Sequence, residues 1–171
     1  MILISKVMRV RCAVLVLGAA CALSARAEAR LLPEVMLVDQ AGLATSTRTL
    51  PPGGRWALIV VEAGQPSAQA LLASLARRQG GWTGKLVIVV AGAAPQAQRL
   101  VQQHAALDGV TWLFDRERNL PAALALRATP AVHAITDNGE IGWHVLGMPA
   151  HANLPAMLSQ WLGTQPMARV R

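Results

Sequence analysis

Cysteine is scarce in this sequence, and its two copies, Cys12 and Cys21, both lie near the N-terminus. No cysteine occurs anywhere after Cys21. The thiolate is the group that attacks in disulfide exchange and in other cysteine chemistry. The chain beyond Cys21 therefore cannot carry out thiol–disulfide exchange with its own side chains.

Several other functional motifs are also missing. There is no Gly-rich phosphate loop, no His-Glu-x-x-His and no Gly-x-Ser-x-Gly. No cluster of basic residues is longer than Arg77-Arg78, so nothing predicts nucleic-acid binding. We expect no cofactor. The acidic residues near the ends of predicted elements are expected to be solvated turn charges, namely Asp108, Asp115, Glu117, Asp137 and Glu140.

The N-terminus has the order of a secretory signal peptide. Basic residues from Lys6 to Arg11 precede the apolar run 12–23, and the small-residue triplet Ala25-Arg26-Ala27 follows it. That run has 12 residues, whereas a membrane span needs about 20. We therefore predict a signal peptide over 1–27, cleavage before Glu28 and a periplasmic location. Retention of the segment as an anchor is an open alternative.

A lipid anchor on Cys21 is a second alternative, because the small residues Gly18-Ala19-Ala20 precede this cysteine. The position three residues before a lipidated cysteine is usually a larger aliphatic residue, so this alternative is less favoured. Removal of 1–27 leaves 12 of the 16 basic residues against all 9 acidic ones, a net charge of +3. The 144 remaining residues suit one domain with a single core.

Alternating apolar runs and helical patterns give the predicted order of elements. Strands are expected at 34–39, 56–62, 86–90, 110–114, 131–136 and 141–146. Leu71, Leu72, Leu75 and Ala76 recur at helical spacing after the turn 64–67, which predicts a helix of about three turns that stops near Gly80-Gly81. Further helices are expected over about 95–104, 120–126 and 153–162. The stretch through Thr45-Ser46-Thr47 is expected to be irregular, and Asn138-Gly139 predicts a two-residue hairpin turn. The result is a three-layer α/β fold with a mixed sheet, a C-terminal β-hairpin and a final helix.

These elements divide the chain into four segments. After the signal peptide 1–27, a strand and an irregular lead-in occupy 28–55. The main domain spans 56–162, and 163–171 is expected to be a flexible tail.

From about Val35 to Leu162 the sequence resembles exported thioredoxin-like proteins of the TlpA type. The segment from Ala128-Thr129-Pro130 to Asp137-Asn138-Gly139 is similar to the family's Gly-Thr-Pro-Thr-Thr-Phe-(hydrophobic)-Ile-Asp-x-x-Gly. The resemblance implies a cis peptide bond at Pro130, next to the family's active site. Ala128 replaces the usual glycine, and His133 replaces the usual aromatic residue.

A second segment carries the resemblance to the redox motif. Where the family has Trp-Cys-x-Pro-Cys, this chain has Ala63-Gly64-Gln65-Pro66-Ser67, so the two cysteine positions fall on Gly64 and Ser67. The resemblance implies a binding groove formed by the turn Gly64, Gln65, Pro66 and Ser67 together with Thr129 and Pro130. Taken alone, Ser67 is expected to satisfy a free amide at a helix start, and an anion site there is less favoured.

Two histidines could lie side by side. With a two-residue turn at Asn138-Gly139, His133 would face His144 across the hairpin at about 5 Å between Cβ atoms. A three-residue loop would separate them. We favour a structural role, and keep a metal site at His133 and His144 as a less favoured alternative, because no third ligand is indicated.

The leading hypothesis is a redox-inactive module of the cell envelope that binds a peptide or protein partner in the groove and is not an enzyme. The alternatives are a cysteine-independent enzyme or metal-binding protein, and an accessory component of a secretion or conjugation apparatus. No permanent membrane span and no nucleic-acid partner are expected.

Overall fold

The computed structural model describes residues 30–50, 53–77, 82–150 and 152–164. The predicted signal peptide, both cysteines and nearly all of the predicted tail lie outside these residues. Within the described part, no helix has the length and apolar character needed to cross a membrane.

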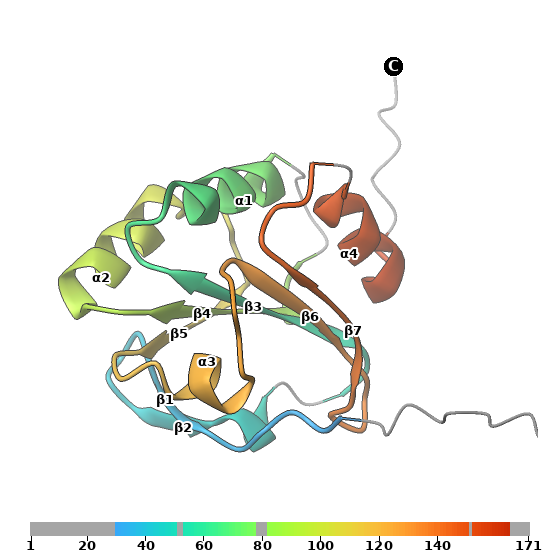
Figure 1. Cartoon of the computed structure of the whole chain (residues 1–171), viewed down its shortest axis with the longest axis horizontal. Helices are drawn as coiled ribbons and strands as arrows, with labels where there is room; N and C mark the ends of the chain where they lie inside the picture. Colours follow the sequence, from blue (N-terminus) through green and yellow to red (C-terminus); the bar gives the residue numbers. More distant parts are fainter. Residues whose placement is uncertain (1–29, 51–52, 78–81, 151, 165–171) are drawn as a thin grey trace, which may run out of the picture.

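A seven-stranded mixed sheet forms the centre of the fold, with the strand order β2-β1-β5-β4-β3-β6-β7 (Figure 1). The strands β3, β4 and β5 are mutually parallel, and the remaining pairs are antiparallel. The strands are β1 (Met36–Asp39), β2 (Ala44–Ser46), β3 (Trp56–Glu62), β4 (Leu86–Ala91), β5 (Thr111–Asp115), β6 (Ala131–Ile135) and β7 (Ile141–Leu146).

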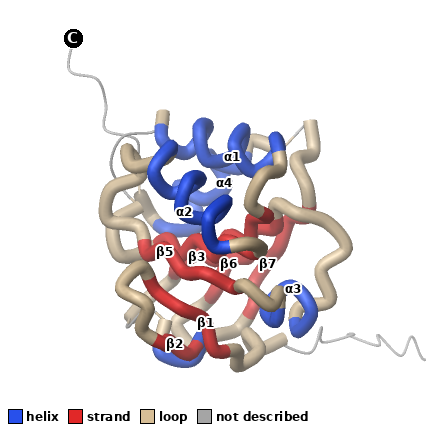
Figure 2. The backbone as a smooth tube through the Cα atoms, turned by 90° about the vertical axis from the view of Figure 1, so that its left-hand side faces the viewer, coloured by secondary structure: helices blue, strands red, loops and turns tan. Residues whose placement is uncertain are grey.

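Helices lie on both faces of this sheet. They are α1 (Pro66–Ala76), α2 (Ala94–Gln103), α3 (Asn119–Ala123) and α4 (Leu154–Leu162), with a 3-10 turn η1 (Thr47–Thr49) before β3. Figures 1 and 2 show α1, α2 and α4 on one face of the sheet and α3 on the other. The predicted three-layer α/β fold is confirmed.

The apolar runs predicted most of the elements correctly, because burial on both faces leaves an unambiguous pattern. The bounds of β3 and β7 are those predicted. The stretch expected to be irregular was wrong: it forms β2 and η1. The Asp39 carboxylate accepts the N–H groups of Ala41 (2.9 Å) and Leu43 (2.8 Å), which turns the chain back so that β2 pairs with β1.

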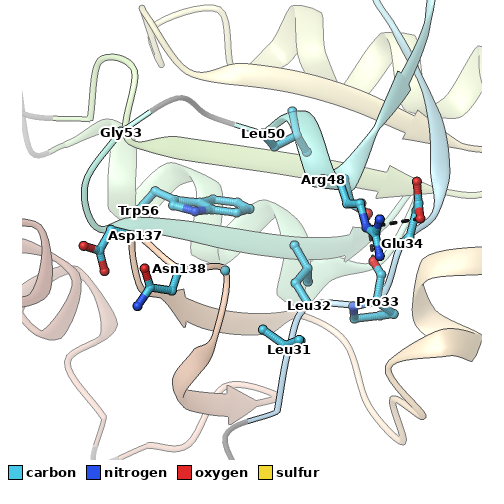
Figure 3. A pocket seen from close by; sticks show the side chains of 12 residues that line it. Leu31, Leu32, Pro33, Glu34, Arg48, Leu50, Gly53, Trp56, Asp137 and Asn138 are labelled. Carbon is cyan, nitrogen blue, oxygen red and sulfur yellow. Dashed lines mark hydrogen bonds and ion pairs between the residues drawn. The ribbon is translucent and has the colours of Figure 1, made fainter.

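The N-terminal segment pairs with the end of the hairpin loop, just before β7. Leu31 bridges Glu140, and the Leu32 N–H donates to the Gly139 carbonyl at 2.9 Å. Between this segment, η1 and the hairpin loop lies a pocket of about 630 Å³ (Figure 3). Its lining includes Leu31, Leu50 and Trp56, and Trp56 is only 3% exposed.

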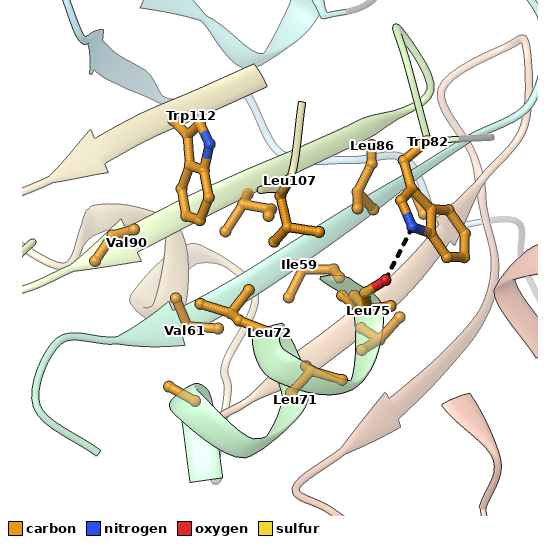
Figure 4. Close-up of a cluster of buried hydrophobic side chains, with 14 of the residues drawn as sticks. Ile59, Val61, Leu71, Leu72, Leu75, Trp82, Leu86, Val90, Leu107 and Trp112 are labelled. Atoms are coloured by element: carbon orange, nitrogen blue, oxygen red, sulfur yellow. Dashed lines mark hydrogen bonds between the residues drawn. The ribbon is translucent and has the colours of Figure 1, made fainter. Parts of the chain in front are cut away.

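The helical face of the sheet encloses the larger of two apolar clusters (Figure 4). Leu71, Leu72 and Leu75 recur at helical spacing on α1, and all are fully buried against β3 and β4. The Trp82 indole N–H donates to the Leu75 carbonyl at 3.3 Å. This packing fixes α1, and therefore the turn that leads into it.

Candidate functional site

The turn between β3 and α1 carries four of the six predicted groove residues. β3 ends at Glu62, and Gly64 has φ +89°, a left-handed conformation that side chains rarely adopt. α1 begins at Pro66, whose missing N–H is no loss in the first helical turn. Gln65 is the N-cap, and its side chain makes no capping hydrogen bond.

Ser67 does not act as predicted. It is the second residue of α1, and its hydroxyl donates to Gln65 Oε1 at 3.5 Å instead of accepting a free helical amide. The prediction of a capping role is therefore wrong, because the N-cap position belongs to Gln65.

The other two groove residues, Thr129 and Pro130, lie directly before β6. The peptide bond between them is cis, as predicted. Since β6 runs antiparallel to β3, with Val60 opposite Ala131, the start of β6 lies beside the end of β3. The Thr129 hydroxyl donates to Gln65 Oε1 at 2.8 Å. The structure thus brings all six predicted groove residues together; that they bind a partner stays a prediction.

The backbone of Thr129 is unpaired on this edge. Neither its N–H nor its carbonyl has a hydrogen-bond partner in the described part of the chain, although the next carbonyl, that of Pro130, accepts the Gly147 N–H at 2.7 Å. The Thr129 residue is only partly exposed. A backbone donor and a backbone acceptor without a partner among the described residues therefore lie beside the turn.

A polar network that the sequence did not predict holds the turn in place. Arg118 forms a two-pronged ion pair with Glu62, at 3.0 Å to Oε1 and 3.2 Å to Oε2. Gln65 Nε2 donates to Glu62 Oε2 at 2.9 Å, and its Oε1 accepts from Thr129. Gln65 thus links the end of β3 to the residue before Pro130, in a chain of contacts from Arg118 to Thr129.

Asp115 holds the segment that carries Arg118. It is 3% exposed, and its carboxylate accepts the N–H groups of Asn119 (3.0 Å) and Leu120 (2.8 Å) at the start of α3. The prediction of a solvated turn charge at Asp115 is therefore wrong. By capping α3 it fixes the segment that presents Arg118, whose own backbone is left-handed at φ 61°.

The sequence matches no protein-family model and no curated protein. Solved structures do match over most of the chain. A protein assigned as the thiol:disulfide interchange protein DsbE of Chlorobium tepidum has a TM-score of 0.64 at 16% identity, covering 80% of this chain and 96% of that one. The chain has the thioredoxin-like fold.

Two further solved structures agree with this assignment of the fold. A secreted disulfide oxidoreductase of Mycobacterium tuberculosis, homologous to E. coli DsbE, has a TM-score of 0.60 at 18% identity over 77% of this chain and 96% of its own. StoA of Bacillus subtilis has a TM-score of 0.56 at 12% identity, over 77% and 97%. The structural similarity establishes a thioredoxin-like fold, and the low sequence identities leave the activity open.

On the hairpin of this thioredoxin-like fold, His133 lies opposite His144, as predicted. Their ring centroids are 5.8 Å apart and the rings are stacked. The two-residue turn used in that prediction was wrong. Thr136 and Glu140 close a three-residue loop in which Gly139 has φ 78°, and a bulge at Gly142 then restores the register.

The environment of His133 keeps its ring neutral. The residue is 3% exposed, and neither ring nitrogen has a hydrogen-bond partner among the residues that the structure describes. Burial, with smaller contributions from the nearby charges of His144 and Arg30, lowers the pKa of His133 to about 4. A group of three or more possible metal ligands does not occur among the described residues. Two imidazoles supply only half of the ligands of a closed zinc site.

Proposed function

We propose that this protein is a non-catalytic thioredoxin-fold module of the cell envelope that binds an extended peptide or protein segment. The binding surface is the groove formed by Gly64, Gln65, Pro66 and Ser67 with Thr129 and Pro130. The proposal combines a retained thioredoxin-like scaffold with the absence of a thiol at the site.

The observation that carries the proposal is the unpaired backbone of Thr129 beside the start of α1. An extended segment could satisfy the Thr129 N–H and carbonyl by adding a short strand to this edge. Unpaired backbone groups are costly when a surface is covered, so such a partner must supply complementary donors and acceptors. The surface therefore favours main-chain recognition of a peptide.

The polar network supports binding without catalysis. Gln65 joins the turn to Thr129 through hydrogen bonds of 2.9 and 2.8 Å, so the groove is ordered before a partner arrives. Preorganisation reduces the entropy that binding must overcome. At the two cysteine positions of the family, Gly64 has no side chain and Ser67 has a hydroxyl, which lacks the acidity of a thiol. Thiol-dependent reduction and oxidation are therefore not expected.

The envelope location rests on the N-terminal signal pattern over 1–27. One structural relative is described as secreted. The mass of the protein purified from periplasm tests this part: chain cleaved before Glu28 is expected, whereas a lipid on Cys21 would favour the lipoprotein alternative.

Titration by NMR tests the groove directly. The probes are eight-residue peptides of alternating Val and Thr, each with Glu, Gln or Lys at one position. The backbone amide signals of Gly64, Ser67 and Thr129 are expected to shift on addition of peptide, while that of Asn138 at the opposite end stays in place. Shifts confined to the Asn138 end, or none with any peptide, would refute the groove. An insulin-reduction assay on the same protein is expected to show no activity.

A cysteine-independent enzyme or metal-binding protein that uses His133 and His144 is the second candidate. The stacked rings and the unpartnered nitrogens of His133 favour it. Metal content of the purified protein separates the two candidates, because stoichiometric metal that is lost in His144→Gln would favour the second. A structural accessory role in a secretion or conjugation apparatus is the third candidate, and it is supported only by the predicted export and the small size of the chain.

A further inference from the structure

A small polar hollow adjoins the groove at Gly64. It has a volume of about 280 Å³ and lies between the start of α1 and the outer face of α2. Leu100, 2% exposed, contributes the apolar part of the lining. We call this hollow the glutamine pocket; it is lined by Gly64, Gln69, Gln96, Arg99, Leu100 and Gln103.

Gly64 joins the glutamine pocket to the groove. A Cβ atom placed on Gly64 would lie 3.8 Å from Gln96 Oε1, which is ordinary contact distance. In the family that this chain resembles, a cysteine stands at this position. The absence of a side chain here therefore leaves the pocket open toward the groove, so a segment lying across Gly64 could place one side chain in it.

The polar side chains of the pocket are all free to bind. The three glutamines and Arg99 are exposed, and none has a hydrogen-bond or ion-pair partner in the described part of the chain. Each amide offers two N–H donors and the guanidinium offers five. The lining contains no carboxylate, and the neighbouring Glu62 is already paired with Arg118 and Gln65.

This composition distinguishes between possible side chains of a bound segment. A lysine would meet the positive charge of Arg99 with no acid to offset it. A neutral amide could pair with the glutamines and accept a hydrogen bond from Arg99, but it carries no charge to attract the guanidinium. A carboxylate can accept from the amides and also form a charge-assisted pair with Arg99.

We infer that the segment bound in the groove places an acidic side chain, Asp or Glu, in the glutamine pocket, where Arg99 and the glutamine amides hold it. The inference rests on the proposed function and adds a specificity that the groove alone does not have. Arg99 is the specificity-determining residue, and Gly64 provides the passage.

The peptide panel described above tests the inference by fluorescence polarisation, with the purified protein. At one peptide position, Glu is expected to bind up to about fivefold more tightly than Gln, the range of an exposed ion pair. Arg99→Gln is expected to abolish this difference, and Arg99→Glu to reverse it in favour of Lys. Raising the salt concentration is expected to weaken the Glu preference.

Arg116→Gln is the matched control. Arg116 is also an exposed arginine at this end of the sheet with no partner in the described part of the chain, but it does not line the pocket. Arg116→Gln changes the net charge by the same amount as Arg99→Gln but leaves the pocket intact. The Glu preference is therefore expected to survive in this variant. If Arg99→Gln and Arg116→Gln reduced the Glu preference equally, the preference would come from long-range attraction between the peptide and the protein's net charge. That result would overturn the inference.

The outcomes also separate the inference from the proposed function. If the panel binds with shifts at Thr129 but shows no preference for Glu at any position, the pocket inference fails and the groove stands. If no peptide binds, the groove itself fails. A Glu preference that Arg99→Gln leaves intact would place the acidic contact elsewhere.

Discussion

The two ends of β3 are built in different ways. At its start, Trp56 lines the large pocket of about 630 Å³. The chain around that pocket is tied together by main-chain bonds such as Leu32 N–H to Gly139 and by the ion pair of Arg48 with Glu34. At its end, side chains also tie the turn, but the Thr129 backbone has no hydrogen-bond partner among the described residues. If pocket size alone were the criterion, the start of β3 would have been chosen as the binding site.

Unsatisfied hydrogen-bonding groups are the better guide to function here. A pocket whose walls are already bonded to one another is stable without a ligand. Its residues hold the N-terminal segment on the sheet. The smaller pocket at Gly64 has four polar side chains with no partner among the described residues, next to a free backbone edge. The comparison predicts that changes at the first end affect stability, and changes at the second end affect binding.

The largest expected effect is at the first end. Trp56→Ala should lower the free energy of unfolding by about 3–5 kcal/mol, because it removes a large side chain that is only 3% exposed. Urea unfolding measures this loss. Under native conditions the affinity for the peptide panel should be unchanged, since Trp56 is distant from Thr129 along the sheet. If Trp56→Ala lowered the affinity for the peptides and left the free energy of unfolding unchanged, the start of β3 would be the binding end.

The second largest effect is the pH dependence of His133, which lies between the two ends. Its pKa is about 4 in the folded protein and near 6.5 when unfolded, so the unfolded chain binds the proton more readily. The contribution of neutral His133 to the free energy of unfolding is fully present above pH 6.5. This contribution falls by about 3 kcal/mol as the pH is lowered toward 4. Urea unfolding at pH 7 and pH 4.5 measures the difference.

Variants isolate this contribution from that of the carboxylates. His133→Leu should lose less stability between pH 7 and pH 4.5 than the wild type, because it has no ring to protonate. His144→Gln should show an intermediate loss, because the charge of His144 is a secondary cause of the lowered pKa. The idea fails if His133→Leu retains the full pH dependence of the wild type.

The sequence predicted most of the strands and the position of the turn, but it did not predict the long-range side-chain contacts that hold the turn. Local apolar patterns were enough for β3 and β7, and the resemblance to thioredoxin-like proteins correctly placed the turn beside Thr129. The ion pair of Arg118 with Glu62 joins residues 56 positions apart, and the bond from Thr129 to Gln65 spans 64. No local pattern encodes such contacts, because they arise only when the sheet brings the strand ends together.

The histidine pair shows a different limit of sequence reasoning. The facing of His133 and His144 was predicted from a two-residue turn that does not exist. The three-residue loop shifts the register by one, and the bulge at Gly142 shifts it back. Two compensating irregularities left the final pairing unchanged, and neither could be read from the periodicity of the strands.

At the second end, the side chain of Gln65 holds the turn in place. Gln65→Ala should cost about 2 kcal/mol of stability, because it removes a bond to the Glu62 carboxylate and a bond to the Thr129 hydroxyl. It should also loosen the groove, which is seen as faster hydrogen exchange at Ser67 and weaker peptide binding. Gln102→Ala is the control, since Gln102 is exposed on α2 and lines none of the described pockets. Similar effects of both variants would contradict the role of the network.

The smallest expected change in stability gives the sharpest test, because it compares two glycines in nearly the same backbone conformation. Gly64 has φ 89° and Gly42 has φ 85°, and a Cβ at either position would meet no atom closer than 3.8 Å. Alanine at either site should therefore cost about 1 kcal/mol through backbone strain alone. Only Gly64→Ala should also weaken the binding of peptides with Glu, because its methyl group narrows the passage into the glutamine pocket. Urea unfolding and fluorescence polarisation on the two variants give both numbers. If Gly42→Ala weakened binding as much as Gly64→Ala does, the effect would come from lost stability, and the passage at Gly64 would have no part in recognition.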